Sequence, residues 1–154
     1  ATVDAVKLRL QQCSWVHLAC HGHQDLQTPT QSHLQLYEGK LDLETILRMP
    51  LPSAQFAFLA ACQTAMADDN LVNESFHLGG GFITAGFQSV IATMWFMRDS
   101  DGPVVAEVVY SHLFREGQQP KHTDAAEALQ LAVKELKNKK VPHERWMPFI
   151  HIGV

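Results

Sequence analysis

The chain of 154 residues contains no apolar stretch close to the about 20 residues that a membrane-spanning helix needs. It also lacks a long basic run: 16 acidic residues outnumber 12 lysines and arginines, which gives a formal net charge of −4. These absences argue against a membrane protein and against a general binder of nucleic acids or membrane surfaces. No internal repeat or low-complexity tract is present either.

Cysteine is scarce, with 3 residues that cannot all pair with one another. Cys13, Cys20 and Cys62 lie in or beside apolar runs rather than in a regularly spaced framework. This usage is typical of a reducing compartment, so we expect a cytoplasmic protein. Cys20, His21 and His23, together with His17 on the same side of the strand as His21, offer ligand types for zinc. Zinc sites, however, normally recruit a second spaced cluster, and no C-x-x-C pair exists. We expect neither a bound metal nor a cofactor.

The chain does have enough apolar sequence to fold. Hydrophobic residues make up 46% of it, which supports a globular protein with a real core. We expect a single domain over residues 1–154. Because the sequence opens with Ala1 and enters a helical pattern directly, we also expect this domain to be a C-terminal fragment of something larger.

Apolar runs alternate with amphipathic stretches along the chain. Strands are predicted over residues 15–19, 55–61, 89–94 and 149–152, with a small hairpin that joins 34–36 to 40–43. Helices are predicted over residues 3–13 and 42–47, from 73 through the glycines at 79–81, and over 103–113 and 124–136. Strands separated by helices predict a three-layer α/β domain, with a mainly parallel sheet covered on both faces.

Several helix ends carry recognisable signals. Thr2 and Asp42 stand where N-caps are expected, and Asp124 with Glu127 matches a capping box of the Asp type. The glycines at 79–81 are costly inside a helix, at about 1 kcal/mol each, so we expect another part of the chain to approach this backbone closely.

Two of the predicted strands end at residues that carry chemistry. The first is followed by His21 and the second by Cys62. Sites in open parallel sheets lie beyond the carboxyl ends of the strands, so we expect both residues just past the ends of neighbouring strands. A cysteine thiol whose pKa stays near the free value of about 8.5 is mostly protonated at neutral pH, so it needs a nearby imidazole to accept its proton. The pair predicts a cysteine nucleophile with its base.

Backbone groups beside this pair are candidates for an oxyanion hole. Gly22 leaves a bare N–H next to His21, and Cys62 offers its own N–H. Two alternatives remain open. Cys62 is a small buried hydrophobe in one of them, because cysteines in apolar strands usually are. The weaker alternative is a serine triad of Ser75, His77 and Asp99, for which the sequence lacks a G-x-S-x-G elbow.

Four blocks of sequence together resemble a known family. They are ACHGH at 19–23, LAACQTA at 59–65, IATMWFMRDSD at 91–101 and RWMPFIHIGV at 145–154. In this order they closely resemble a CHAT domain, the caspase-like cysteine peptidases related to separases. The segments GFQSVIATMW at 86–95 and PFIHIG at 148–153 look most like those of the fungal members.

The resemblance implies a caspase-like fold and a catalytic dyad of His21 and Cys62, with no third member. It implies that the amides of Gly22 and Cys62 form the oxyanion hole. In separases an acidic residue shortly after the tryptophan of the matching block contacts a basic substrate side chain. Here Trp95 is followed by Asp99 and Asp101, so these residues are implied to bind an arginine or lysine before the scissile bond. Asp101 has an alternative role as helix cap beside Pro103, which favours Asp99.

One departure from the family pattern concerns the start of the chain. A complete caspase-like sheet has strands before the opening helix, and they are absent here. The resemblance implies a protein or peptide substrate. Its other implied partner is a regulatory repeat or sensor region, or the missing N-terminal strands. The rival interpretation is an interaction or scaffold module that keeps the fold without turnover.

Overall fold

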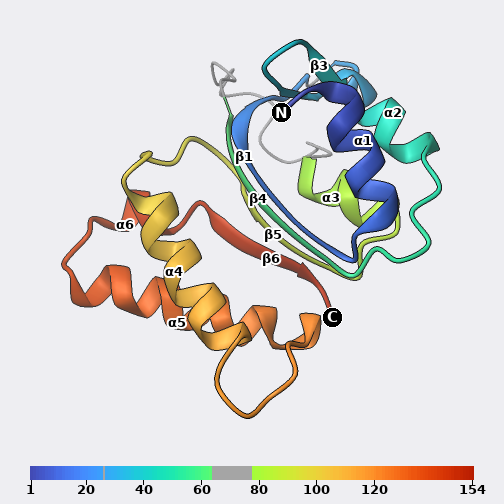
Figure 1. Ribbon diagram of the computed structural model, residues 1–154. Helices are drawn as coiled ribbons and strands as arrows, with labels where there is room; N and C mark the ends of the chain where they lie inside the picture. The colour runs from blue at the N-terminus through green and yellow to red at the C-terminus, as the bar shows by residue number, and fades with distance from the viewer. Residues whose placement is uncertain (26, 64–77) are drawn as a thin grey trace.

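The computed structural model describes residues 1–25, 27–63 and 78–154, and for 61–63 only the backbone. It shows an α/β protein in three layers (Figure 1). A six-stranded mixed sheet has the strand order β3-β2-β1-β4-β5-β6. The strands are β1 (Trp15–His23), β2 (His33–Gln35), β3 (Lys40–Asp42), β4 (Phe56–Gln63), β5 (Ser89–Thr93) and β6 (Phe149–Gly153).

Helices cover both faces of the sheet. One face carries α1 (Val3–Gln12), α2 (Leu43–Arg48) and α3 (Leu78–Thr84), and the other carries α4 (Asp101–Leu113), α5 (Ala125–Asn138) and α6 (His143–Trp146), as Figure 1 shows. Short 3-10 turns, η1 (Pro29–Gln31) and η2 (His122–Asp124), complete the elements. Among the residues that the structure describes, no helix has the length and apolar character needed to cross a membrane.

Each face has its own hydrophobic core, and β4 contributes to both. Ala57 and Leu59 pack towards α1 and α3, whereas Phe56 and Phe58 pack towards α4 and α5. Successive side chains of a strand point to opposite faces, so a strand buried on both sides reads as the continuous apolar run seen in the sequence. The α5 stripe of Ala125, Leu129, Ala132 and Leu136 is buried in the second core, as predicted.

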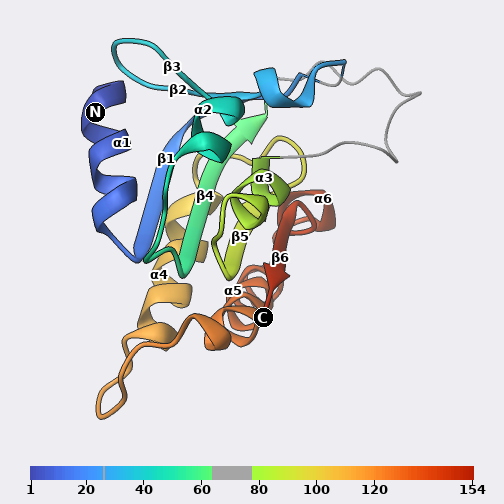
Figure 2. The same cartoon turned by 90° about the vertical axis from the view of Figure 1, so that its right-hand side faces the viewer.

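The sheet is only partly parallel, which corrects the expectation of a mainly parallel one. β1, β4 and β5 are parallel, but β2 pairs with β1 and β6 pairs with β5 in the antiparallel sense. The predicted hairpin accounts for β2 and β3. β6 is reversed because α4 and α5 cross the sheet in opposite directions, which returns the chain to the end where β5 stops (Figures 1 and 2).

The first strand is longer than predicted. The sequence predicts its end at Ala19, whereas β1 continues to His23. The extra residues pair with β2, which places His21 opposite Gln35 and His23 opposite His33, so their backbone groups gain a partner strand. β4 likewise runs to Gln63. His21 and Cys62 therefore lie within the last residues of their strands, and the prediction that they follow the strand ends is wrong.

The helix caps are confirmed at two places and corrected at a third. Thr2 Oγ1 accepts from the Ala5 amide at 3.2 Å, and Asp42 Oδ1 accepts from the Thr45 amide at 2.7 Å. Asp124 makes no side-chain cap for α5, because its carboxylate accepts from Arg115 at 2.8 Å instead. An available guanidinium outcompetes the backbone amides for this carboxylate, so the predicted capping box does not form.

The glycine-rich helix is confirmed where the structure describes it, while its predicted start near Asn73 lies outside the described residues. A Cβ atom at Gly81 would collide with the side chain of Leu43, the first residue of α2, which is fully buried. The expected close approach is therefore the packing of α2 against the backbone of α3.

Replacing Gly81 by alanine tests this packing. We expect Gly81→Ala to lower the free energy of unfolding by about 1–3 kcal/mol, because the added methyl overpacks against Leu43. Gly39→Ala is the matched control: its Cβ would lie 3.5 Å from Val3, an ordinary contact, so its stability should change by less than about 1 kcal/mol. Urea unfolding of both variants measures the difference, and equal midpoints would contradict the account.

Candidate active site

The parallel pairing of β1 with β4 brings together the two residues singled out in the sequence. His21 is the register partner of Cys62. Neighbouring strands lie about 4.8 Å apart, and paired positions belong to the same face of a sheet. On this face the pairs form three rows: His21 with Cys62, then Ala19 with Ala60, then His17 with Phe58. The side chain of Cys62 lies outside the described residues, so its position in β4 is what the structure gives.

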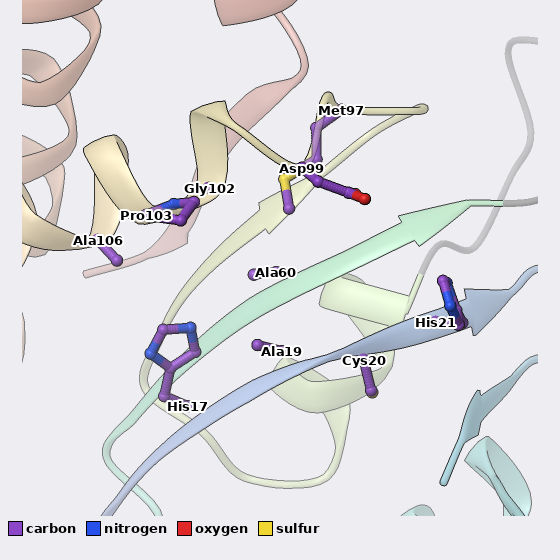
Figure 3. A pocket seen from close by; sticks show the side chains of 10 residues that line it. All are labelled: His17, Ala19, Cys20, His21, Ala60, Met97, Asp99, Gly102, Pro103 and Ala106. Atoms are coloured by element: carbon purple, nitrogen blue, oxygen red, sulfur yellow. The ribbon is translucent and has the colours of Figure 1, made fainter.

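A pocket of about 370 Å³ lies on the same face of the sheet, between β1 and the start of α4. We call it the β1–α4 pocket. Figure 3 shows that β1, β4, α4 and the loop before α4 all contribute to it. Its lining is made of His17, Ala19, Cys20, His21, Ala60, Met97, Asp99, Gly102, Pro103 and Ala106.

The pocket exists because small residues meet across it. Ala19 and Ala60 form the row between the two histidine rows, and Gly102 and Ala106 face them from α4. The second core fills this face of the sheet with Phe56, Phe58 and their neighbours, but alanine side chains leave the space open at the second row. The walls are largely apolar, and the polar groups of the lining are concentrated in the two histidines and Asp99.

Asp99 reaches the pocket from the loop between β5 and α4. It is exposed, and Figure 3 shows it across the pocket from His17 and Ala19. Met97, two residues earlier, is buried at 5% exposure and anchors this loop. A Cβ atom on Gly102 would lie 3.0 Å from Met97 Cε, so the loop packs tightly on the first turn of α4. This packing places a carboxylate at the edge of an apolar pocket.

Asp101 is not brought to the pocket. It is the first residue of α4, is 2% exposed, and forms a bidentate ion pair with Arg145 of α6. Arg145 donates from Nε to Oδ2 at 2.9 Å and from a terminal nitrogen to Oδ1 at 2.5 Å. This partner raises the pKa of the guanidinium further above its usual range. Asp101 thus ties α4 to α6, and the predicted cap position is taken by Ser100.

Trp95 also lies away from the β1–α4 pocket. It is 40% exposed and lines a separate cavity of about 360 Å³ with Phe96, Arg98, Pro142, Glu144 and Arg145. Gly22 is buried in β1, where its register partners are Leu34 of β2 and Gln63 of β4. It directly follows His21, but it is not among the residues that line the β1–α4 pocket.

Burial shifts the pKa values of three further side chains in or beside the pocket. The sequence indicated His17 only as a possible zinc ligand, whereas the structure places it in the lining of the β1–α4 pocket. Partial burial against Phe58 and Tyr110 lowers the pKa of its ring, and burial raises the pKa of Tyr110 to about 12. Cys20 packs against the core on the opposite face, and burial raises the pKa of its thiol. Its thiol therefore stays protonated at neutral pH. The described residues contain no group of three side chains arranged to hold a metal ion.

The fold points to a class of proteins. A six-stranded mixed sheet flanked by helices on both faces is consistent with a caspase-like fold. The model of the CHAT domain family matches residues 1–154, so the chain belongs to the CHAT family, which includes caspase-like peptidases. A search of the curated proteins found no match.

The two aspartates near the pocket are distinguished by their effect on stability. We expect Asp101→Asn to unfold at a clearly lower urea concentration than the wild type, because Arg145 loses its charged bidentate partner. Asp99→Asn should shift the midpoint much less, since Asp99 is exposed at the pocket edge. Equal shifts in the two variants would show that the ion pair does not tie α4 to α6.

Proposed function

We propose that this domain is a cysteine endopeptidase with a His21/Cys62 dyad that cleaves proteins after a basic residue. The observation that carries the proposal is the register of β1 with β4, which pairs His21 with Cys62 on the sheet face that carries the β1–α4 pocket, lined by His21 and Asp99 among others. Membership of the CHAT family supports the same chemistry. A histidine beside a cysteine is the minimum arrangement for an activated thiol.

Each step of the reaction has a group in this arrangement. Cys62 Sγ bonds to the carbonyl carbon of the scissile peptide as its proton moves to His21. Collapse of the tetrahedral intermediate breaks the C–N bond, and His21 protonates the leaving amine. Water then attacks the thioester, which releases the new carboxylate and restores the thiol. The amides of Gly22 and Cys62 are our candidates for donors to the oxyanion.

The β1–α4 pocket accounts for the proposed specificity. An arginine or lysine side chain has an apolar stem and a cationic end. Ala19, Ala60 and Pro103 provide apolar contact for the stem, and the Asp99 carboxylate attracts the cation. We further propose that the domain works in the cytoplasm on a protein substrate, under the control of a repeat or sensor region or of additional N-terminal strands.

The dyad is tested by substitution and by labelling. We expect Cys62→Ala and His21→Ala each to abolish cleavage of an arginine reporter peptide, because each removes a group that forms or breaks a bond. Cys13→Ala and His143→Phe are matched controls away from the site, and both should keep wild-type rates.

A thiol-reactive arginine peptide provides a second measurement. It should label the wild type and the Cys13→Ala control, but not Cys62→Ala. Equal labelling of the wild type and Cys62→Ala, without cleavage by either, would favour the rival function, a catalytically silent interaction module.

The role of Asp99 is tested by charge removal. We expect Asp99→Asn to lower kcat/KM for an arginine reporter by about 10- to 100-fold, which corresponds to the loss of hydrogen bonds to a charged group. The loss should be small for a reporter with norleucine in place of the basic residue. Asp4→Asn, an exposed substitution on α1, controls for the change in net charge. An equal loss for both reporters would contradict a role in specificity.

A further inference from the structure

The lining of the β1–α4 pocket includes an exposed histidine, His17, that the proposed reaction does not use. His17 lies four residues before His21 on β1, so the two share a face and their Cα atoms lie about 13 Å apart. Ala19 stands between them and is exposed. Figure 3 shows the two imidazoles at opposite ends of the pocket, with Ala19 and Ala60 along its floor.

The His17 ring is held by aromatic contacts. It meets Phe58 edge-on, with ring centroids 4.6 Å apart, and lies 5.5 Å from the ring of Tyr110. Phe58 is buried at 1% exposure and Tyr110 packs against the second core, so both supports are rigid. Within the described part of the chain these rings are the contacts found for the His17 side chain. They fix its plane while its nitrogens remain available to a ligand in the pocket.

Building on the proposed function, we propose that His17 is a specificity-determining residue. Its imidazole accepts a hydrogen bond from an arginine side chain whose other N–H groups donate to Asp99. Apart from His21 of the proposed dyad, the β1–α4 pocket thus offers two acceptors, Asp99 on the loop before α4 and His17 on β1. This arrangement selects arginine over lysine.

The protonation state of the ring fits this role. Burial against Phe58 and Tyr110 lowers the pKa of His17, so the ring is neutral at pH 7 and one nitrogen is an acceptor. Among the described residues, the titratable groups in the lining of the same pocket or against the ring are Asp99, His21, Cys20 and Tyr110. Tyr110 stays a neutral phenol because its pKa is raised to about 12. A neutral His17 does not repel a cationic substrate side chain.

The geometry distinguishes the two basic side chains. A guanidinium carries five N–H donors in a planar fork, so it can donate in two directions at once. The lysine ammonium is a compact point charge, so it binds closely to one of the two acceptors rather than to both. Removal of the His17 acceptor should therefore weaken arginine binding more than lysine binding.

Binding measured without turnover tests the inference separately from the proposed reaction. The full chain is prepared with Cys62→Ala, and calorimetry measures the affinities of two peptides that differ only in arginine or lysine. With His17 intact, we expect arginine to bind about tenfold more tightly, as a hydrogen bond to a charged group implies. His17→Phe keeps a ring on Phe58 but removes the acceptor, and should reduce the preference to about twofold or less.

Two further variants sharpen the result. His17→Gln restores an acceptor and should recover most of the arginine preference, whereas His143→Phe, on the exposed surface of α6, should leave it unchanged. An unchanged preference in His17→Phe, or no binding of the arginine peptide to the Cys62→Ala chain, would overturn the inference. Failure of the proposed function has a different signature: normal arginine selectivity in binding with no labelling of Cys62 in the wild type.

Discussion

The in-register pairing of β1 with β4 is the interaction on which the site depends. A slip of one residue would move every side chain of a strand to the opposite face, so His21 and Cys62 share a face only in the observed register. The register is fixed from both sides, because β4 buries Ala57 and Leu59 in one core and Phe56 and Phe58 in the other. The packing that stabilises the fold is therefore the same packing that pairs the imidazole strand with the thiol strand.

The pocket follows from a local exception to this packing. On this face of the sheet, the large side chains of Phe56 and Phe58 fill the first positions of β4. The next position of β4 on the same face is Ala60, which pairs with Ala19 of β1. Small residues on α4 continue the gap, and Met97 packs on Gly102 to hold the preceding loop against the helix. A cavity of this kind costs stability where a larger side chain would fit. Its position directly below the paired residues makes a substrate-binding role a consistent explanation for that cost.

Much of the fold could be predicted from periodicity and caps, because those signals are local. The apolar runs locate the central strands, and Thr2 and Asp42 cap their helices as predicted. The errors arise where distant residues compete. Pairing with β2 extends β1 beyond Ala19, and Arg115 takes the carboxylate of Asp124 away from its cap. His17 was missed as a pocket residue although it shares the strand period with His21, since an empty space above a strand leaves no mark in the sequence.

The contrast between Asp99 and Asp101 shows how a helix start can place two similar residues in different surroundings, one in a buried ion pair and one at the edge of a pocket. Both closely follow Trp95 in the sequence, and their spacing alone does not distinguish them. α4 begins at Asp101, where the chain turns towards α6 and the carboxylate meets Arg145, so that charge is neutralised inside the protein. Asp99 still lies in the loop, where Met97 anchors the backbone and the side chain reaches the pocket. A buried carboxylate requires a fixed cation, whereas a carboxylate at the edge of an apolar pocket can take its cation from a ligand. We propose that this ligand is an arginine side chain, because its guanidinium can donate to Asp99 and to His17 at the same time.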